Sequence, residues 1–349
     1  MKSIKKLSNF KSSGLDGVQN IFIKNLSNLF PSLKLSFEKL LDTCYIPDWM
    51  LKGKTTLIQK KPTDEFQVGN YRPITCLLNF WKLLSSCISE SIYSHFSSEN
   101  IFPFEQKGCI KRTLGTVDQL LIDKNISKHA HQNKRNLYVP WIDYRKAFDS
   151  VSHDWIFKCF SIFKVNEKLK NFLSQAFNLF KTSLTYKNVQ IGSIDIKQGI
   201  YQGDSLSPLL FIMTLIPLST LLNKQTKGYT IGTNKNKEHI SHLLFVDDIK
   251  LYATSEKNLK NLLHTTERFS NDVGLHFGFP KCSITVMKKG VPQKITSILM
   301  NEGVIHPLQE EYKYLGINQT TTTLTNKSKE ELKDKYFERL EHLLKTKLS

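Results

Sequence analysis

Two neighbouring aspartates, Asp247 and Asp248, stand between two short apolar segments, and this arrangement constrains the fold more than any other feature of the sequence. The segments are His242-Leu-Leu-Phe-Val246 and Ile249-Lys-Leu-Tyr-Ala253. Apolar runs of this length separated by two residues predict two antiparallel strands joined by a tight turn. The hairpin would carry two carboxylates at its tip, and adjacent negative charges beside buried strands cost free energy unless a cation lies close.

A third carboxylate, Asp143, follows the apolar segment Leu137-Tyr-Val-Pro-Trp-Ile142, which predicts a buried strand. Pro140 fits such a strand poorly, because proline is usually confined to strand edges and bulges. An aspartate at a strand end most often caps a turn or a helix, and for Asp143 alone that interpretation is the stronger one. If the sheet places this strand beside the hairpin, the three carboxylates converge and offer hard oxygen ligands for two Mg²⁺ ions.

The rest of the chain alternates helical and strand patterns irregularly, which predicts an α+β domain with helices covering one side of the sheet. The region 31–97 is mostly helical in pattern, interrupted by a strand at Lys54–Lys60 and a turn at Lys61–Asp64. Further helices are expected after Asp149 and before Gly274, which is placed to end the second one. A charged amphipathic helix closes the chain, with apolar positions Leu332, Tyr336, Phe337, Leu340 and Leu344.

The net charge of +18, from 49 Lys and Arg against 31 Asp and Glu, indicates a polyanionic partner such as nucleic acid. A soluble surface rich in lysine explains the same composition equally well. Six cysteines lie far apart without a CxxC pair, which predicts reduced thiols and an intracellular protein, nuclear or cytoplasmic. We expect no membrane association, because the uncharged segment Ser205–Asn223 contains polar residues and Pro217, and the N-terminus lacks the apolar stretch of a signal peptide.

Three segments together resemble motifs A, B and C of the reverse transcriptases encoded by non-LTR (LINE-type) retrotransposons. They are Ile142-Asp-Tyr-Arg-Lys-Ala-Phe-Asp-Ser-Val-Ser-His-Asp154, Gly199-Ile-Tyr-Gln-Gly-Asp-Ser-Leu-Ser-Pro208 and Phe245-Val-Asp-Asp248. The resemblance covers most of the chain, from about residue 12 to residue 320. It includes Ser13-Gly-Leu-Asp-Gly17, Asn70-Tyr-Arg-Pro-Ile74, Glu105-Gln-Lys-Gly108, Thr116-Val-Asp-Gln-Leu120, Gly274-Leu275, Lys281-Cys282 and Tyr314-Leu-Gly316.

The resemblance implies a right-hand polymerase fold with fingers at 1–140, a palm at 141–310, and a primer grip with a truncated thumb at 311–349. It also implies RNA-directed DNA synthesis, in which deoxynucleotides are added to a primer 3′ end by two-metal phosphoryl transfer with Mg²⁺ or Mn²⁺. The partners would be an RNA template, a DNA primer and deoxynucleoside triphosphates. We further expect the chain to be a fragment of a longer element-encoded protein.

By this resemblance the catalytic carboxylates and metal ligands are Asp143, Asp247 and Asp248, of which Asp248 would bind the metal more loosely. Lys281 corresponds to a lysine that could protonate the pyrophosphate leaving group, a general-acid role that requires correct placement. Tyr314 belongs to the turn that would grip the primer.

The resemblance also implies four residues that contact the nucleotide. Lys60 and Arg72 would neutralise the triphosphate, and a guanidinium suits phosphate oxygens through its forked geometry. Phe148 would lie against the sugar and exclude a 2′-hydroxyl, with plain core packing as its alternative. Gln202 would support the nucleotide and template. The sequence departs from motif B at Tyr201, where the family commonly has arginine.

Two alternative functions remain open. The chain could be a catalytically impaired remnant that binds nucleic acid, although a decayed copy should lose carboxylates first and all three remain here. It could instead be a group II intron or retron-type reverse transcriptase, but no maturase-like extension is visible, which favours the retrotransposon interpretation.

Overall fold

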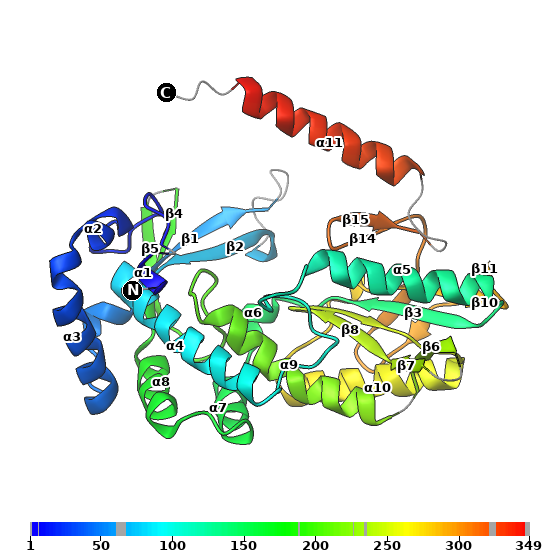
Figure 1. Ribbon diagram of the computed structural model, residues 1–349, viewed down its shortest axis with the longest axis horizontal. Coiled ribbons are helices and arrows are strands. Elements are labelled where there is room, and N and C mark those ends of the chain that lie inside the picture. The colour runs from blue at the N-terminus through cyan, green and yellow to red at the C-terminus, as the bar shows by residue number, and fades with distance from the viewer. Residues whose placement is uncertain are drawn as a thin grey trace. The chain divides into compact units, whose positions relative to one another are not determined.

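The computed structural model describes residues 2–5, 7–60, 68–187, 189–225, 227–233, 236–320 and 326–345. It divides the chain into two compact units, each assembled from separate stretches of sequence (Figure 1). Unit 1 contains Met1–Pro103, Lys146–Pro217 and Asp272–Leu275, and unit 2 contains Phe104–Arg145, Leu218–Asn271 and His276–Ser349. The turn predicted at Lys61–Asp64 lies outside the described residues.

The sheet of unit 1 has the strand order β2–β1–β4–β5. These strands are β1 (Lys52–Gln59), β2 (Tyr71–Cys76), β4 (Lys181–Tyr186) and β5 (Val189–Asp195). The strand predicted at Lys54–Lys60 is confirmed as β1, which pairs antiparallel with β2 and parallel with β4. The buried Thr55 hydroxyl lies 2.7 Å from those of both Thr75 and Thr182, so the polar groups inside this sheet satisfy one another.

Helices pack around that sheet within unit 1. They are α1 (Lys2–Lys5), α2 (Asn20–Asn25), η1 (Ser27–Leu29), α3 (Phe30–Thr43), η2 (Asp48–Leu51), η3 (Val68–Asn70), α4 (Asn79–Ser98), α6 (Ala147–Ser150), α7 (His153–Ile162) and α8 (Glu167–Leu179). Trp81 of α4 is fully buried, with ring centroids 6.3 Å from Phe172 and 5.7 Å from Phe180. Aromatic contacts of this kind bury large areas and anchor α4 and α8 to one core.

Helix α9 (Ser207–Lys224) accounts for the long uncharged segment of the sequence. By length and composition it could span a membrane, but 67% of it is buried inside the protein. An apolar helix covered in this way serves as a core helix. The six cysteines are free thiols.

The central sheet of unit 2 has the strand order β12–β13–β10–β3–β9–β8, and β11 pairs with β10. Its strands are β3 (Leu137–Ile142), β8 (His242–Phe245), β9 (Asp248–Leu251), β10 (Ser283–Lys288), β11 (Val291–Gln293), β12 (Ile298–Leu299) and β13 (Val304–Pro307). Two hairpins accompany it, formed by β6 (Tyr229–Thr233) with β7 (Asn236–Ile240) and by β14 (Tyr312–Tyr314) with β15 (Ile317–Gln319). β3 therefore lies in the interior of the sheet. Pro140, which fits a central strand poorly, is paired with Ile284 of β10, whereas β9 pairs only with Trp141 and Ile142 of β3.

Helices cover both faces of this sheet, which corrects the prediction of cover on one side. α5 (Thr116–Gln132) lies along one face, where Ile126 joins a cluster with Leu137 and Val139 (Figure 1). α10 (Glu256–Asp272) lies along the other, where the Ser270 hydroxyl is 2.7 Å from that of Tyr144. Every residue of β3 is buried, and a strand buried on both sides needs cover on both sides.

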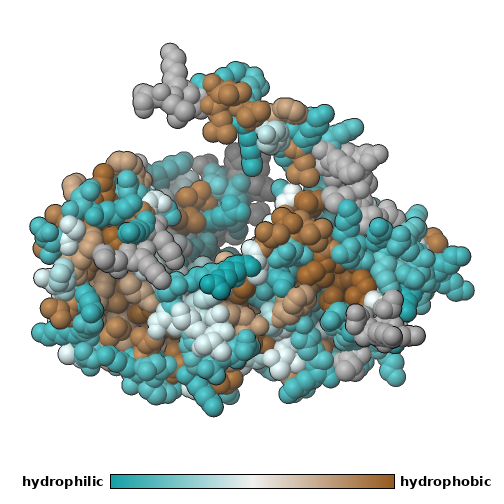
Figure 2. Space-filling model, viewed as in Figure 1, coloured by the Kyte–Doolittle hydropathy of each residue, from teal (hydrophilic) through white to brown (hydrophobic). Residues whose placement is uncertain are grey.

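The last two predicted helices are confirmed, with different surroundings. α10 ends at Asp272, and Gly274 has a φ of +82° that favours glycine. α11 (Asn326–Lys345) carries the expected apolar stripe, but the side chains of this stripe are exposed, as the brown atoms along this helix in Figure 2 show. The exposed fractions run from 37% for Leu340 to 78% for Leu344.

Candidate active site

The turn of the β8–β9 hairpin lies one residue earlier than the sequence predicted. Phe245 pairs with Asp248, so the two turn residues are Val246 and Asp247, and Asp248 is the first residue of β9. On its other side β9 pairs with β3, with Ile249 opposite Ile142. This register brings Asp143, the residue after β3, next to the start of β9. The predicted convergence of the carboxylates thus follows from strand pairing.

The three carboxylates act on one another electrostatically. Burial, together with the charges of Asp247 and Asp143, raises the pKa of Asp248 to about 7, against the opposing charge of Lys281. Burial also raises the pKa of Asp247, with Asp143 contributing in the same direction. Like charges in a partly buried site destabilise the ionised forms, and a cation bound there would relieve this cost.

Asp143 is held by the segment that precedes β10. Lys281, in the 3₁₀ turn η4 (Phe279–Lys281), has its Nζ 3.0 Å from Asp143 Oδ2. The Gly278 amide donates to the Asp143 carbonyl at 2.7 Å, and a Cβ on Gly278 would lie 2.9 Å from Oδ2. Glycine at 278 therefore permits the close approach that sets this carboxylate. Lys281 therefore lies beside Asp143, while its role as a proton donor stays a prediction.

The donor set suits a hard divalent cation such as Mg²⁺. Among the residues that the structure describes, no three His, Cys, Asp or Glu side chains form a group that could hold a metal ion by themselves. Mg²⁺ is usually bound through one or two carboxylates, several waters and substrate phosphates, so a complete cage of protein ligands is not required. Asp143 and Asp247 can supply such a pair, and the raised pKa values of Asp247 and Asp248 indicate that positive charge is favoured there.

The predicted nucleotide-contacting residues lie in unit 1. Gln202 has its Nε2 3.1 Å from Asp149 Oδ1, and its carbonyl accepts the Thr75 amide of β2 at 3.3 Å. Gly203 has a φ of +121°, and a Cβ there would lie 2.9 Å from the Thr75 carbonyl. The motif B loop thus lies closely against β2, which explains the glycine at 203.

A buried aspartate, Asp204, attaches the motif B loop to helix α4. Asp204 Oδ1 accepts the Ser85 hydroxyl at 2.5 Å, and Oδ2 accepts the Trp81 indole at 3.3 Å. Burial raises the pKa of Asp204, and these hydrogen bonds oppose the effect. Tyr201, which replaces the expected arginine, is buried and packs against Phe180 with ring centroids 4.8 Å apart. It supplies packing and no positive charge.

The other three residues of this set have different environments. Phe148 is half-buried and stacks on Phe211, with centroids 5.0 Å apart and planes 9° from parallel. The exposed Lys60 donates to the Gly69 carbonyl at 2.9 Å, and its charge acts to lower the pKa of Asp149. Arg72 is exposed on β2 opposite Ile58. Unit 1 therefore holds Lys60, Arg72, Phe148 and Gln202, while unit 2 holds Asp143, Asp247, Asp248 and Lys281.

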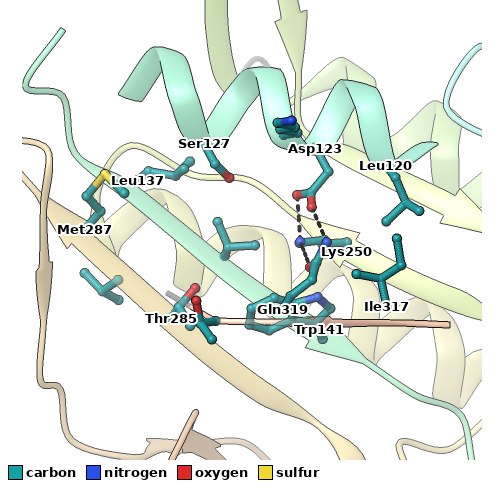
Figure 3. Close-up of a pocket in the computed structure, with 14 residues that line it drawn as sticks. Leu120, Asp123, Ser127, Leu137, Trp141, Lys250, Thr285, Met287, Ile317 and Gln319 are labelled. Carbon is teal, nitrogen blue, oxygen red and sulfur yellow. Dashed lines mark hydrogen bonds and ion pairs between the residues drawn. The ribbon is translucent and has the colours of Figure 1, made fainter. Parts of the chain in front are cut away.

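Sequence reasoning missed a buried ionic network that includes Lys250 of the β8–β9 hairpin (Figure 3). Lys250 Nζ lies 2.6 Å from Asp123 Oδ1 and donates to Gln319 Oε1 at 2.8 Å, and Gln319 Nε2 donates to Asp123 Oδ2 at 2.8 Å. These side chains line a cavity of about 50 Å³ between α5, β3, β10 and β15. A lysine inside the apolar segment Ile249-Lys-Leu-Tyr-Ala253 was the available signal, because a charged residue in a buried strand requires a partner.

Comparison with known proteins gives a consistent result. The family model described as "Reverse transcriptase (RNA-dependent DNA polymerase)" matches residues 58–319. The chain is 28% identical over 326 residues to a Pol polyprotein of the type-2 retrotransposable element R2DM from Drosophila melanogaster, covering 91% of this chain and 29% of the relative. It is 24% identical over 324 residues to the RNA-directed DNA polymerase from mobile element jockey of the same organism, covering 90% and 34%. The chain thus spans about a third of these relatives.

A relative from Popillia japonica, a Pol polyprotein of a type-1 retrotransposable element R2, is 30% identical over 280 residues and covers 78% of this chain and 38% of that protein. These matches confirm the predicted resemblance to non-LTR retrotransposon polymerases. Among solved structures, apo telomerase from Candida Tropicalis truncated from its C-terminal domain superposes with a TM-score of 0.54 at 13% identity, covering 91% of this chain and 63% of that chain. The predicted α+β polymerase fold is confirmed, while the division into fingers, palm and thumb stays a prediction.

Proposed function

The chain belongs to the reverse transcriptase (RNA-dependent DNA polymerase) family, and on this premise we propose that it catalyses RNA-directed DNA synthesis. Its substrates would be deoxynucleoside triphosphates, an RNA template and a primer 3′ end. The observation that carries the proposal is the pairing of β3 with the β8–β9 hairpin, which places Asp143 next to the start of β9, where Asp247 and Asp248 stand, with Lys281 Nζ 3.0 Å from Asp143 Oδ2.

Asp143 and Asp247, with Asp248 close by, would hold two divalent cations, Mg²⁺ or Mn²⁺, which when bound supply positive charge for the triphosphate and for the attacking 3′ oxygen. The carboxylates orient these charges because strand pairing and the Gly278 amide fix their backbones. Preorganised charge of this kind needs no rearrangement during the reaction. Lys281 Nζ, held 3.0 Å from Asp143, would donate a proton to the departing pyrophosphate.

The residues of unit 1 would bind the nucleotide. Phe148 presents a half-buried ring backed by Phe211, and a rigid ring can exclude a 2′-hydroxyl from the sugar position. Gln202 and the exposed cations Lys60 and Arg72 would contact the template, the nucleotide and its phosphates. The predicted fingers, palm and primer grip remain part of this proposal.

Primer extension on an RNA template tests the proposal directly. The wild-type chain is compared with Asp247→Asn and with Asp195→Asn, a matched control whose carboxylate is 59% exposed on β5 of unit 1. Wild type and Asp195→Asn should extend the primer with Mg²⁺ and deoxynucleotides, while Asp247→Asn should lose at least about a hundredfold in rate. If all three bind template-primer duplex with the same salt dependence and none extends it, the chain is a nucleic-acid-binding remnant and the proposal is wrong.

A further inference from the structure

The motif Glu105-Gln-Lys-Gly108 has no role in the site described above, yet it lies directly against the catalytic hairpin. The Leu244 amide donates to the Glu105 carbonyl at 2.9 Å, and the Lys107 amide donates to the Leu244 carbonyl at 3.1 Å. These bonds form a short parallel bridge between Gln106 and Leu244 of β8. The motif therefore acts as a support strand on the side of β8 that faces away from β9.

The turn beside this support strand has a strained backbone. Val246 has a φ of +57°, in the left-handed region. A β-branched residue rarely adopts this conformation, which is unfavourable and persists only when the surroundings impose it. Val246 directly precedes Asp247, so whatever holds its peptide also directs the carboxylate.

Two residues of the motif hold that peptide. Gln106 Oε1 accepts the Val246 amide at 3.1 Å and the Gly108 amide at 2.8 Å, and its side chain is almost fully buried. Gly108 approaches so closely that a Cβ would lie 2.6 Å from the Val246 nitrogen and 2.7 Å from Val246 Cγ2. Gln106 Nε2 has no hydrogen-bond partner among the described residues, so the hydrogen bonds of this buried amide are made by its acceptor oxygen.

The support strand is itself anchored away from the turn. Asn223 Nδ2 donates to Glu105 Oε1 at 2.9 Å, and the Ser219 hydroxyl donates to Oε2 at 3.4 Å. Both partners belong to α9, which is part of the core. Gln106 is thus fixed through Glu105 to α9. A residue can hold its neighbour in a strained conformation only if its own position is fixed in this way.

We propose that Gln106 and Gly108 are positioning residues, which hold the strained Val246–Asp247 turn and thereby fix the Asp247 carboxylate for phosphoryl transfer. This inference deepens the proposed polymerase function and rests on it for the catalytic consequence. The structural part, that the Gln106 oxygen holds the Val246 amide, stands independently and can be measured without metal or substrate.

Two substitutions of Gln106 distinguish the effect of its acceptor oxygen from the effect of its side-chain shape. Gln106→Met keeps the length and removes the oxygen, whereas Gln106→Glu keeps an acceptor oxygen in either protonation state. Gln225→Met is the matched control, because the Gln225 side chain donates to Thr265, a residue of the same unit that lies outside the hairpin. Hydrogen exchange of the Val246 amide is followed in metal-free protein, and the kcat and KM for a deoxynucleotide are measured in primer extension.

Gln106→Met should accelerate exchange of the Val246 amide at least about tenfold, as loss of one buried hydrogen bond requires. It should also lower kcat by about tenfold to a hundredfold, since small misplacements of reacting groups have effects of this size, and leave KM within about twofold. Gln106→Glu and Gln225→Met should keep the amide protected. In a Val246→Gly background, where a positive φ is not strained, Gln106→Met should lose much of its effect.

The hydrogen-exchange and primer-extension measurements together distinguish failure of this inference from failure of the proposed function. If the wild-type chain does not extend primers but the exchange pattern is as expected, the polymerase proposal and the catalytic part of this inference fail together, while the support of the turn is upheld. If the wild-type chain extends primers and Gln106→Met has unchanged exchange or unchanged kcat, the inference is overturned on its own. An equal loss in Gln225→Met would also overturn it, because a general loss of stability would then explain the result.

Discussion

Lys250 Nζ lies 2.6 Å from Asp123 Oδ1, and the two side chains are only 3% and 5% exposed. Lys250 stands two residues after Asp248 on β9, and its ammonium also lies over the rings of Trp141 and Tyr314, 4.4 Å and 4.9 Å from their centroids. Through Gln319 the same ion pair reaches β15 (Figure 3). The β14–β15 hairpin, which carries the predicted primer-grip residues, is therefore fixed to β9 by a buried charge pair.

Lys250→Met should destabilise the protein by about 3–5 kcal/mol, because Asp123 would remain buried without its counter-charge. Urea unfolding monitored by circular dichroism measures the change. The double variant Lys250→Met, Asp123→Asn should recover part of the loss, since no buried charge then remains. Lys260→Met is the control: Lys260 pairs with Glu256 on the surface of α10 with 63% of its side chain exposed, and should cost less than about 1 kcal/mol. Equal losses at the two lysines would contradict this interpretation.

Lys281→Gln should raise the pKa of Asp248 above its value of about 7, because the Lys281 charge is the influence that lowers it. The sign follows from charge: removing a nearby cation disfavours the carboxylate, so its proton is lost at higher pH. Carbon-13 NMR titration of aspartate carboxyls in metal-free protein measures the shift. Lys281→Arg should leave the titration nearly unchanged. An unchanged titration in Lys281→Gln would show that this lysine does not act on the acidic cluster.

Phe148→Val should relax discrimination against ribonucleotides if the ring lies against the sugar. The smaller side chain leaves room for a 2′-hydroxyl, so kcat/KM for a ribonucleotide should rise at least about tenfold while the value for the deoxynucleotide changes little. Single-nucleotide extension with both substrates measures the ratio. Phe157→Val is the control for packing loss, because Phe157 of α7 contacts the rings of Phe160 in the same helix and Phe177 of α8. A fall in stability without a change in the ratio would assign Phe148 to core packing alone.

The buried His242 should make the folded protein less stable in mild acid. Its imidazole is fully buried between the Ser219 and Ser241 hydroxyls, at 2.7 Å and 2.8 Å, and burial lowers its pKa from 6.5 to about 4 against the nearby Glu105 charge. Between these two pH values the unfolded chain binds the proton and the folded chain does not, so the free energy of unfolding contributed by His242 falls as the pH decreases from 6.5 towards 4.

Urea midpoints measured between pH 4 and pH 7 test this expectation. The difference between wild type and His242→Gln should shrink as the pH falls, because glutamine does not titrate. His264→Gln, at an exposed position on α10, is the control substitution. A constant difference for His242→Gln would mean that the imidazole is not held neutral in the folded protein.

The sequence by itself determined the local elements that carry the chemistry. The apolar run that ends before Asp143 and the two runs around Asp247 and Asp248 are strands, since a short apolar segment bounded by turn residues has few other stable conformations. The order of the motifs also indicated the family and the fold. These properties depend on near neighbours in the chain, and near neighbours are visible in a sequence.

Only the tertiary structure decided how distant segments support that site. The turn falls at Val246 and Asp247, one residue earlier than predicted, because pairing of Phe245 with Asp248 fixes the register. The Gln106 oxygen meets the Val246 amide across 140 residues of chain, and the pair of Asp123 with Lys250 joins a helix to a strand. Such contacts depend on packing of helices on both faces of the sheet, and no periodicity within one segment encodes them.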